Sequence, residues 1–200
     1  MSQMYFTESA LEGIARSVLQ KYSPNYMNAA PQAVPIEYII EEVYDLTIEY
    51  KRLSKSGKML GKTIFDDGWT SYFDLETGRY EFIYQKEGTM MLEVSLIDDN
   101  MGRLRFTMAH ELAHWVIHQR LYKGTGEIAA FITSDQDNST EWQANTVANR
   151  ILMPKGQIKR CFYGFVSNHC SPRTAALEMS KIFGVSYQAM EIRLHEAGLM

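Results

Sequence analysis

The sequence predicts an α+β fold, in which two helices and several short strands are followed by further helices. Apolar residues recur every three or four positions near the N-terminus and again in the second half of the chain, which is the spacing of helices that bury one face. Between residues 46 and 97, segments rich in aromatic and β-branched residues alternate with segments that contain Gly and Asp, which is typical of strands and hairpins. We expect these strands to form a small, mostly antiparallel sheet.

Two helices are predicted in the first 45 residues. Thr7 is a candidate N-cap for the first, whose apolar residues run from Ala10 to Leu19 at helical spacing. Residues 22–34 are rich in Pro, Asn and Ala and predict a loop. Pro35 suits the first turn of a second helix, because its missing N–H would have no partner there.

Five strands are predicted next, at residues 46–50, 62–65, 69–73, 79–84 and 91–97. The segment Leu75-Glu76-Thr77-Gly78 between the third and fourth strands is typical of a hairpin loop. The last strand leads into a long helix, for which Asp99 or Asn100 is a suitable N-cap.

The second half of the chain is predicted to be helical. One helix runs from about residue 101 to about residue 121, and another begins near Asn138 and ends before Pro154. The polar segment between them contains Gly, although residues 128–133 could form a short strand. From Ser171 on, a helix, a turn at Gly184 and a second short helix give the outline of a helix-turn-helix unit. We therefore expect a domain at residues 1–165 and a helical C-terminal segment at residues 166–200.

Composition limits the classes of protein that the chain can belong to. With 200 residues, of which 46% are hydrophobic, it can bury one core and a small appended unit. Its net charge of −4 argues against a protein that mainly binds nucleic-acid phosphates. The start does not resemble a signal peptide, and no apolar stretch approaches the roughly 18 residues that span a bilayer. Two cysteines are too few for a disulfide scaffold, so we expect free thiols, a cytoplasmic location and no membrane association.

The segment His110-Glu111-Leu112-Ala113-His114 carries the most specific chemistry in the sequence. Residues four apart in a helix lie one turn apart on nearly the same face, so both imidazoles can bind one metal ion. Glu111 projects to the side, where its carboxylate can reach a water molecule on that ion. This H-E-x-x-H pattern is typical of zinc hydrolases and predicts a zincin-like domain with Glu111 as general base. The alternative is an amphipathic helix with two incidental histidines.

A catalytic zinc ion needs a third protein ligand and an open position for water. His118 is one turn beyond His114, but it lies about 12 Å along a straight helix from His110, too far for one ion to take all three. We expect His118 to pack or to contact a partner. Glu141, at the start of the next helix, is the better third ligand. An alternative is a capping box of Asn138 and Glu141, which needs no metal.

Two further features favour Glu141 as a ligand. Asn145 lies one turn later on the same helix face and can hold the outer nitrogen of a ligand histidine. Small residues allow the two helices to approach closely, namely Ala109, Ala113, Ala144 and Ala148.

The segments around His110 and Glu141 resemble those of a known family. Residues 105–114, RFTMAHELAH, followed by His118, resemble the R-F-T-x-A-H-E-L-G-H-x-x-x-H block of the ImmA/IrrE metallopeptidases. Glu141-Trp142-Gln143-Ala144-Asn145, with Met153-Pro154 beyond it, is similar to that family's E-x-E-A-N-x-F-A-A-x-L-L-M-P block. Residues 183–199 also resemble the family's ending. The departures are Gln143 for a second Glu, which favours Glu141 as the ligand, Ala113 for Gly and Val147 for Phe.

The resemblance implies a zinc-dependent endopeptidase, with manganese as an alternative metal, that cleaves a helix-turn-helix transcriptional repressor of a mobile element or a stress response. His110, His114 and Glu141 would be the metal ligands, and Glu111 the catalytic residue. A non-catalytic regulator that binds and sequesters a repressor is the main alternative, and a hydrolase of small amides is another. Direct DNA binding is disfavoured, because the last predicted helix offers only Arg193 for base contacts.

Other polar residues are weaker candidates for a functional role. Tyr122, Tyr163 and His169 could each stabilise an oxyanion, and each could equally be structural or lie at the surface. Cys161 and Cys170 with His169 give only a weak pattern for a separate metal site.

Overall fold

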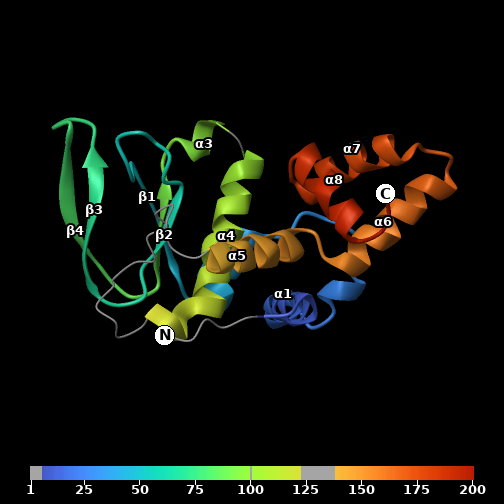
Figure 1. Cartoon of the computed structure of the whole chain (residues 1–200), viewed down its shortest axis with the longest axis horizontal. Coiled ribbons are helices and arrows are strands. Elements are labelled where there is room, and N and C mark those ends of the chain that lie inside the picture. Colours follow the sequence, from blue (N-terminus) through green and yellow to red (C-terminus); the bar gives the residue numbers. More distant parts are fainter. Residues whose placement is uncertain (1–5, 100, 123–137) are drawn as a thin grey trace.

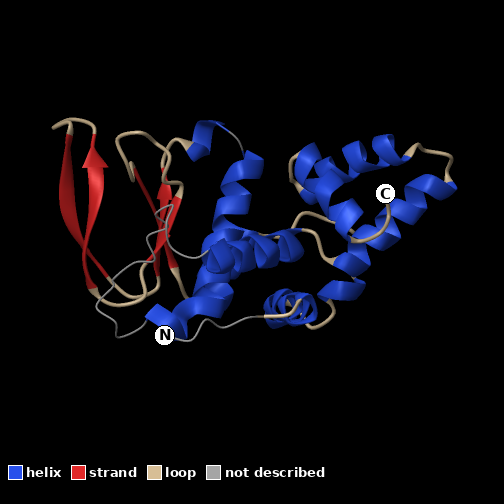
Figure 2. Ribbon diagram, viewed as in Figure 1, coloured by secondary structure: helices blue, strands red, loops and turns tan. Residues whose placement is uncertain are grey.

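The chain folds into helices and short strands, as the sequence predicts (Figure 1). The structure, a computed structural model, describes residues 6–99, 101–122 and 138–200. The strands gather at one end of the molecule and the last three helices at the other, with two long helices between them (Figure 2). Within the described residues, no helix is both long and apolar enough to cross a membrane.

The N-terminal helices form as expected. Helix α1 (Glu8–Tyr22) begins after Thr7, whose hydroxyl accepts a hydrogen bond of 3.2 Å from the Ala10 N–H. The loop that follows contains only the short 3-10 turn η1 (Tyr26–Asn28). Helix α2 (Ile36–Tyr38) continues directly into the π-helical turn η2 (Ile39–Val43). These elements bury their apolar faces in the main core.

The strands form two separate sheets. Strands β1 (Thr47–Lys51), β2 (Gly61–Thr63) and β5 (Thr89–Glu93) form a sheet in the order β1-β5-β2, in which β5 is parallel to β1 and antiparallel to β2. Strands β3 (Gly68–Asp74) and β4 (Arg79–Gln85) form an antiparallel hairpin. Two of the three strand pairs are therefore antiparallel, but the expected single sheet is divided and the central one is mixed.

The predicted strand at residues 91–97 is wrong in its second half. Strand β5 ends at Glu93, and helix α3 (Leu96–Asp99) follows at once. The fully buried Glu93 carboxylate accepts hydrogen bonds from the Leu53 N–H and the Ser95 hydroxyl. The contact with Ser95 turns the chain away from the sheet, and an apolar periodicity cannot reveal such a bond.

Helices α4 (Met101–Tyr122) and α5 (Asn138–Leu152) occupy the centre of the molecule and pack against each other. Helix α4 also contacts β2 and β5. The alanines that we expected to permit a close approach are fully buried, namely Ala109, Ala113, Ala144 and Ala148. The possible strand at residues 128–133 lies outside the described residues.

Three helices complete the chain: α6 (Lys155–Ser167), α7 (Pro172–Phe183) and α8 (Tyr187–Glu196). The sequence analysis missed α6, although Ile158, Cys161, Phe162 and Phe165 recur at helical spacing and lie in or against the core. The expected domain boundary after residue 165 lies within this helix. Helices α7 and α8 are joined at Gly184, whose φ of 64° is left-handed and suits glycine.

Helix α8 is tied to the N-terminal helix by buried charges. The Arg193 side chain is 4% exposed, lies 3.2 Å from a Glu12 carboxylate oxygen, and donates a hydrogen bond to the Met153 carbonyl oxygen. The same Glu12 oxygen lies 3.2 Å from Nε of Arg150 on α5. One carboxylate of α1 therefore pairs with guanidinium groups of α5 and α8.

A buried lysine joins the two sheets. Nζ of Lys62, on β2, donates hydrogen bonds to the Thr70 hydroxyl at 2.9 Å and to the Ser71 carbonyl oxygen at 2.8 Å, both on β3. The Lys62 residue is only 1% exposed. Burial lowers its pKa from 10.5 to about 8, although the carboxylate of Glu111 acts in the opposite direction.

We expect this lysine to make stability rise with pH above about pH 8. Between the folded pKa of about 8 and the unfolded value of 10.5, the unfolded chain holds more protons at Lys62 than the folded chain. The free energy of unfolding therefore increases with pH across this window, by up to about 3 kcal/mol. Lys62→Met should remove that increase, measured by denaturant unfolding at several pH values. The exposed Lys86 gives a matched control, Lys86→Met, which should retain it; parallel curves for wild type and Lys62→Met would contradict the prediction.

Candidate metal centre

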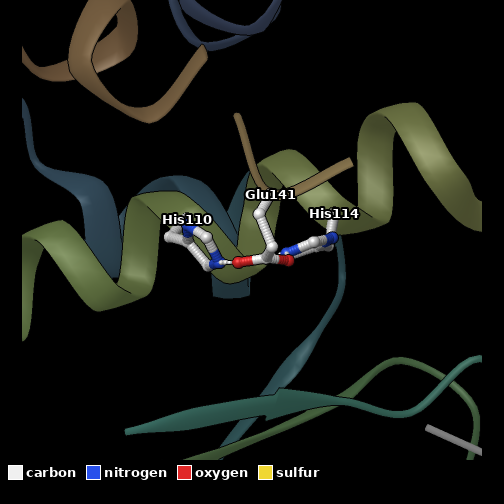
Figure 3. A group of neighbouring side chains, drawn as sticks. All are labelled: His110, His114 and Glu141. Atoms are coloured by element: carbon white, nitrogen blue, oxygen red, sulfur yellow. Dashed lines mark hydrogen bonds and ion pairs between the residues drawn. The ribbon is translucent and has the colours of Figure 1, made fainter. Parts of the chain in front are cut away.

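Two histidines of α4 and one glutamate of α5 converge on a single point. Nε2 of His110 and Nε2 of His114 are 3.0 Å apart, as expected for residues one turn apart on a helix. The Glu141 carboxylate lies between the rings, with Oε2 3.4 Å from His110 Nε2 and Oε1 3.0 Å from His114 Nε2 (Figure 3). The three ligand atoms all lie within 4.8 Å of one another. The structure thus brings together the three residues that the sequence analysis selected.

The outer nitrogen of His110 is held by Asn145. Nδ1 of His110 lies 3.0 Å from Oδ1 of Asn145, one turn after Glu141 on α5. Because the amide oxygen is an acceptor, Nδ1 carries the proton and donates it, which leaves the lone pair of Nε2 directed at the cluster. This is the contact that the spacing of Glu141 and Asn145 predicts, and it fixes the ring for metal binding.

His118 holds the outer nitrogen of His114 in the same way. The His118 ring is fully buried, with Nδ1 3.0 Å from His114 Nδ1 and Nε2 3.2 Å from Oε1 of Gln143. Burial, and then the neighbouring His114, lower the His118 pKa to about 4, so the ring is neutral at physiological pH. Its one proton is donated to Gln143, and its Nδ1 accepts the proton of His114 Nδ1. His118 therefore lies outside the cluster but orients one of its members, a role that the sequence analysis missed.

The charges in the cluster suit a cation. Burial alone would raise the Glu141 pKa, but the imidazoles of His110 and His114 lower it to about 2, so the group is a carboxylate. For His110, burial lowers the pKa, but the carboxylates of Glu141 and Glu111 outweigh it and the net pKa is raised. Glu141 Oε1 is buried and accepts no well-directed hydrogen bond from the described residues. Two nitrogen lone pairs and one carboxylate are the donors that a zinc ion takes from protein, and they leave a position open.

Glu111 lies beside the cluster and is held by strand β2. The residue is 4% exposed, and its Oε2 accepts a hydrogen bond of 2.7 Å from the Thr63 hydroxyl. A Cβ atom at Gly61 would lie 2.3 Å from the other carboxylate oxygen, Oε1. Only glycine therefore leaves room for this carboxylate at position 61. Neither Gly61 nor Thr63 could be found from the sequence, because their contact with Glu111 spans about fifty residues of chain.

A cavity of about 470 Å³ opens at the cluster. His110, Glu111, Glu141 and Asn145 line one side of it. Residues before and within β2 line the other, namely Ser54, Ser56, Lys58, Met59, Leu60 and Gly61. Two of the three proposed ligands, His110 and Glu141, thus share with Glu111 one space that is large enough for part of a polypeptide. His114, which is 1% exposed, belongs to the cluster but does not line the cavity.

The weaker candidates do not join this site. Tyr163 is exposed on α6, and neither it nor the exposed His169 lines the cavity. The side chain of Tyr122 lies outside what the structure describes. Cys161 and Cys170 are free thiols. Across residues 6–99, 101–122 and 138–200, only His110, His114 and Glu141 form a group with three converging ligand atoms, so His169 and the two cysteines, which gave only a weak pattern, do not form such a group.

The arrangement of an H-E-x-x-H helix, a third carboxylate and a buried glutamate in one cavity is that of a metallopeptidase-like domain. The model of the family Peptidase M78, described as the IrrE N-terminal-like domain, matches residues 70–195. The chain belongs to this peptidase family, so the resemblance stated from the sequence is confirmed. The family implies a metal cofactor, which the donor set of His110, His114 and Glu141 fits. No curated protein matches the chain.

We expect removal of the His118 contact to weaken metal binding. His118→Phe keeps an aromatic ring of similar size, but it leaves the Nδ1 proton of His114 without an acceptor. Loss of such an outer hydrogen bond typically lowers metal affinity by about 10- to 100-fold. Competition between the protein and a chromogenic chelator for zinc would measure the effect. His195→Phe alters an exposed histidine far from the cluster and should bind zinc like wild type; equal affinities for all three proteins would contradict the assigned role.

Proposed function

We propose that the protein is a zinc-dependent endopeptidase that cleaves a helix-turn-helix transcriptional repressor in the cytoplasm. The single observation that supports peptidase activity most strongly is the convergence of His110, His114 and Glu141 at a cavity that the buried Glu111 also lines. His110, His114 and Glu141 are the metal ligands in this proposal, and Glu111 is the catalytic residue. Manganese is the alternative metal.

When bound, zinc would lower the pKa of a water molecule and polarise the carbonyl group of the scissile bond. The chain supplies the proton transfer. The Glu111 carboxylate faces the cavity and takes a proton from the attacking water, then passes it to the leaving amine. The Thr63 hydroxyl fixes the orientation of that carboxylate through its 2.7 Å hydrogen bond, and Asn145 and His118 fix the two ligand rings.

The proposed substrate class rests on the family. The resemblance to ImmA/IrrE proteins implies that the partner is a repressor protein. The pairing of Arg193 in the last helix is also compatible with a protein rather than DNA as the partner. Arg193, the one basic side chain of α8 that we considered for base contacts, is engaged by Glu12 and the Met153 carbonyl. The net charge of −4 likewise disfavours binding to phosphates.

Glu111→Gln should abolish cleavage and preserve metal binding. The amide cannot accept the proton of the attacking water, and loss of a general base typically slows a reaction about 10²- to 10⁴-fold. The experiment incubates the helix-turn-helix repressor encoded nearest to this gene with zinc-loaded wild type or variant, and detects fragments by intact mass. Wild type alone should produce discrete fragments.

Two controls separate the alternatives. Glu141→Ala should lose zinc affinity together with activity, and unchanged affinity would contradict its role as a ligand. A stable complex of the repressor with both wild type and Glu111→Gln, without fragments, would overturn the peptidase proposal in favour of sequestration. Cleavage of small acyl-amides with no cleavage of the repressor would point instead to a small-amide hydrolase.

Gly61→Ala should lower activity without unfolding the protein. The added Cβ would lie 2.3 Å from Glu111 Oε1 and 2.7 Å from its Cδ, so the carboxylate must move away from Thr63. A displacement of about 1 Å in a catalytic group can reduce turnover about 100-fold. The matched control is Gly164→Ala on α6, where a Cβ meets no described heavy atom within 4 Å. The prediction fails if both variants cleave the substrate at the wild-type rate.

A further inference from the structure

A second cavity lies between the central helices and α8. It has a volume of about 400 Å³. Its wall is mainly apolar and includes Phe106 of α4, Leu152 and Met153 at the end of α5, and Val185, Ala189 and Ile192 in and before α8. Ile192 is 50% exposed, so a large apolar side chain stands open to solvent at this place. The helical C-terminal segment therefore contributes directly to a surface next to α4.

The second cavity adjoins the cavity at the metal centre. Phe106 lines both of them, and its ring centroid is 6.2 Å from that of His110. On α5, Asn145 lines the first cavity and Asn149, one turn further along, lines the second. The two cavities thus lie next to each other along α4 and α5, with the second on the side of α8.

We propose that this second cavity is a specificity subsite, which binds a large apolar side chain of the polypeptide substrate on one side of the scissile bond. The inference rests on the proposed peptidase function, since it assigns part of the substrate of the same site. The hydrophobic wall selects an aromatic or long aliphatic side chain, because burying such a side chain against it removes apolar surface from water. Because Phe106 lines both cavities, a polypeptide bound at the metal centre can extend into the second cavity, and we therefore assign the same polypeptide as its occupant.

The helix geometry sets the distance between this side chain and the scissile bond. The second cavity extends along α4 from Phe106 to Gly102, which is about 6 to 12 Å from His110 at 1.5 Å per residue. An extended peptide advances about 3.3 Å per residue. The apolar side chain therefore lies about two to four residues from the scissile bond.

Peptide hydroxamates test this inference without knowledge of the natural substrate. The hydroxamate group chelates the zinc ion, and a single Phe is placed at increasing distance from it along a chain of glycines. One series carries the hydroxamate at the C-terminus and a second carries it on an N-terminal malonyl cap, so that both directions of the peptide chain from the metal centre are sampled. All-glycine peptides of equal length are the reference, and calorimetry with zinc-loaded protein gives the dissociation constants.

In one of the two series, Phe should tighten binding about tenfold over glycine when it is two to four residues from the chelating group. Ile192→Glu places a charge in the wall and should remove this gain, and Ile192→Ala should reduce it. The matched control is Leu177→Glu, which alters a residue of α7 that is 44% exposed and does not line the cavity. That variant should keep the full gain, and all variants should bind the all-glycine peptides like wild type.

The outcomes separate the subsite from the peptidase proposal. Equal affinity of Phe and glycine peptides at every spacing, or a gain that persists in Ile192→Glu, overturns the subsite while leaving the metal centre intact. If no hydroxamate binds to the zinc-treated protein, the metal centre itself is contradicted, and the subsite falls with it.

Discussion

Glu141 can reach the two histidines of α4 only because α5 lies directly against that helix. Contact at this distance requires small side chains, and both helices supply fully buried alanines near the cluster, among them Ala113 and Ala144. A larger residue at these places would separate the helices and withdraw the carboxylate from the imidazoles. The close contact between α4 and α5 is therefore the main constraint on the site. The arrangement of the three cluster residues depends on it, as do the low pKa of Glu141 and the adjoining cavities.

Two different parts of the fold hold the two halves of the chemistry. The proposed ligands and the groups that orient them, Asn145, His118 and Gln143, all belong to α4 and α5. The Glu111 carboxylate is instead positioned from β2, by the Thr63 hydroxyl and the space above Gly61. In the proposed mechanism, metal affinity and proton transfer should consequently be separable, the first through changes in the helix pair and the second through changes in the strand.

The local parts of the site were predictable, and the contacts between distant segments were not. The spacing of His110 and His114 determines their relation within one helix, and the same holds for Glu141 and Asn145, so the sequence suffices for both pairs. Thr63 lies on a strand whose place beside α4 depends on the whole fold, and nothing in its surroundings in the sequence indicates it. The turn into α3 has a similar cause, since it involves a side-chain hydrogen bond that an apolar periodicity does not reveal. Helix α6 is different, because its apolar residues do recur at helical spacing and could have predicted it.

The ion pairs of Glu12 indicate that the folding unit begins before the matched range. The family match starts at residue 70, yet the carboxylate of α1 is shared by Arg150 and Arg193, whose side chains are 7% and 4% exposed. Without the first helix, two buried guanidinium groups would lose this counter-charge, which would lower the stability of the folded state. The N-terminal helix, the ligand-bearing helix α5 and the last helix should thus unfold in a single cooperative transition, and a fragment cut to the matched range would be only marginally stable.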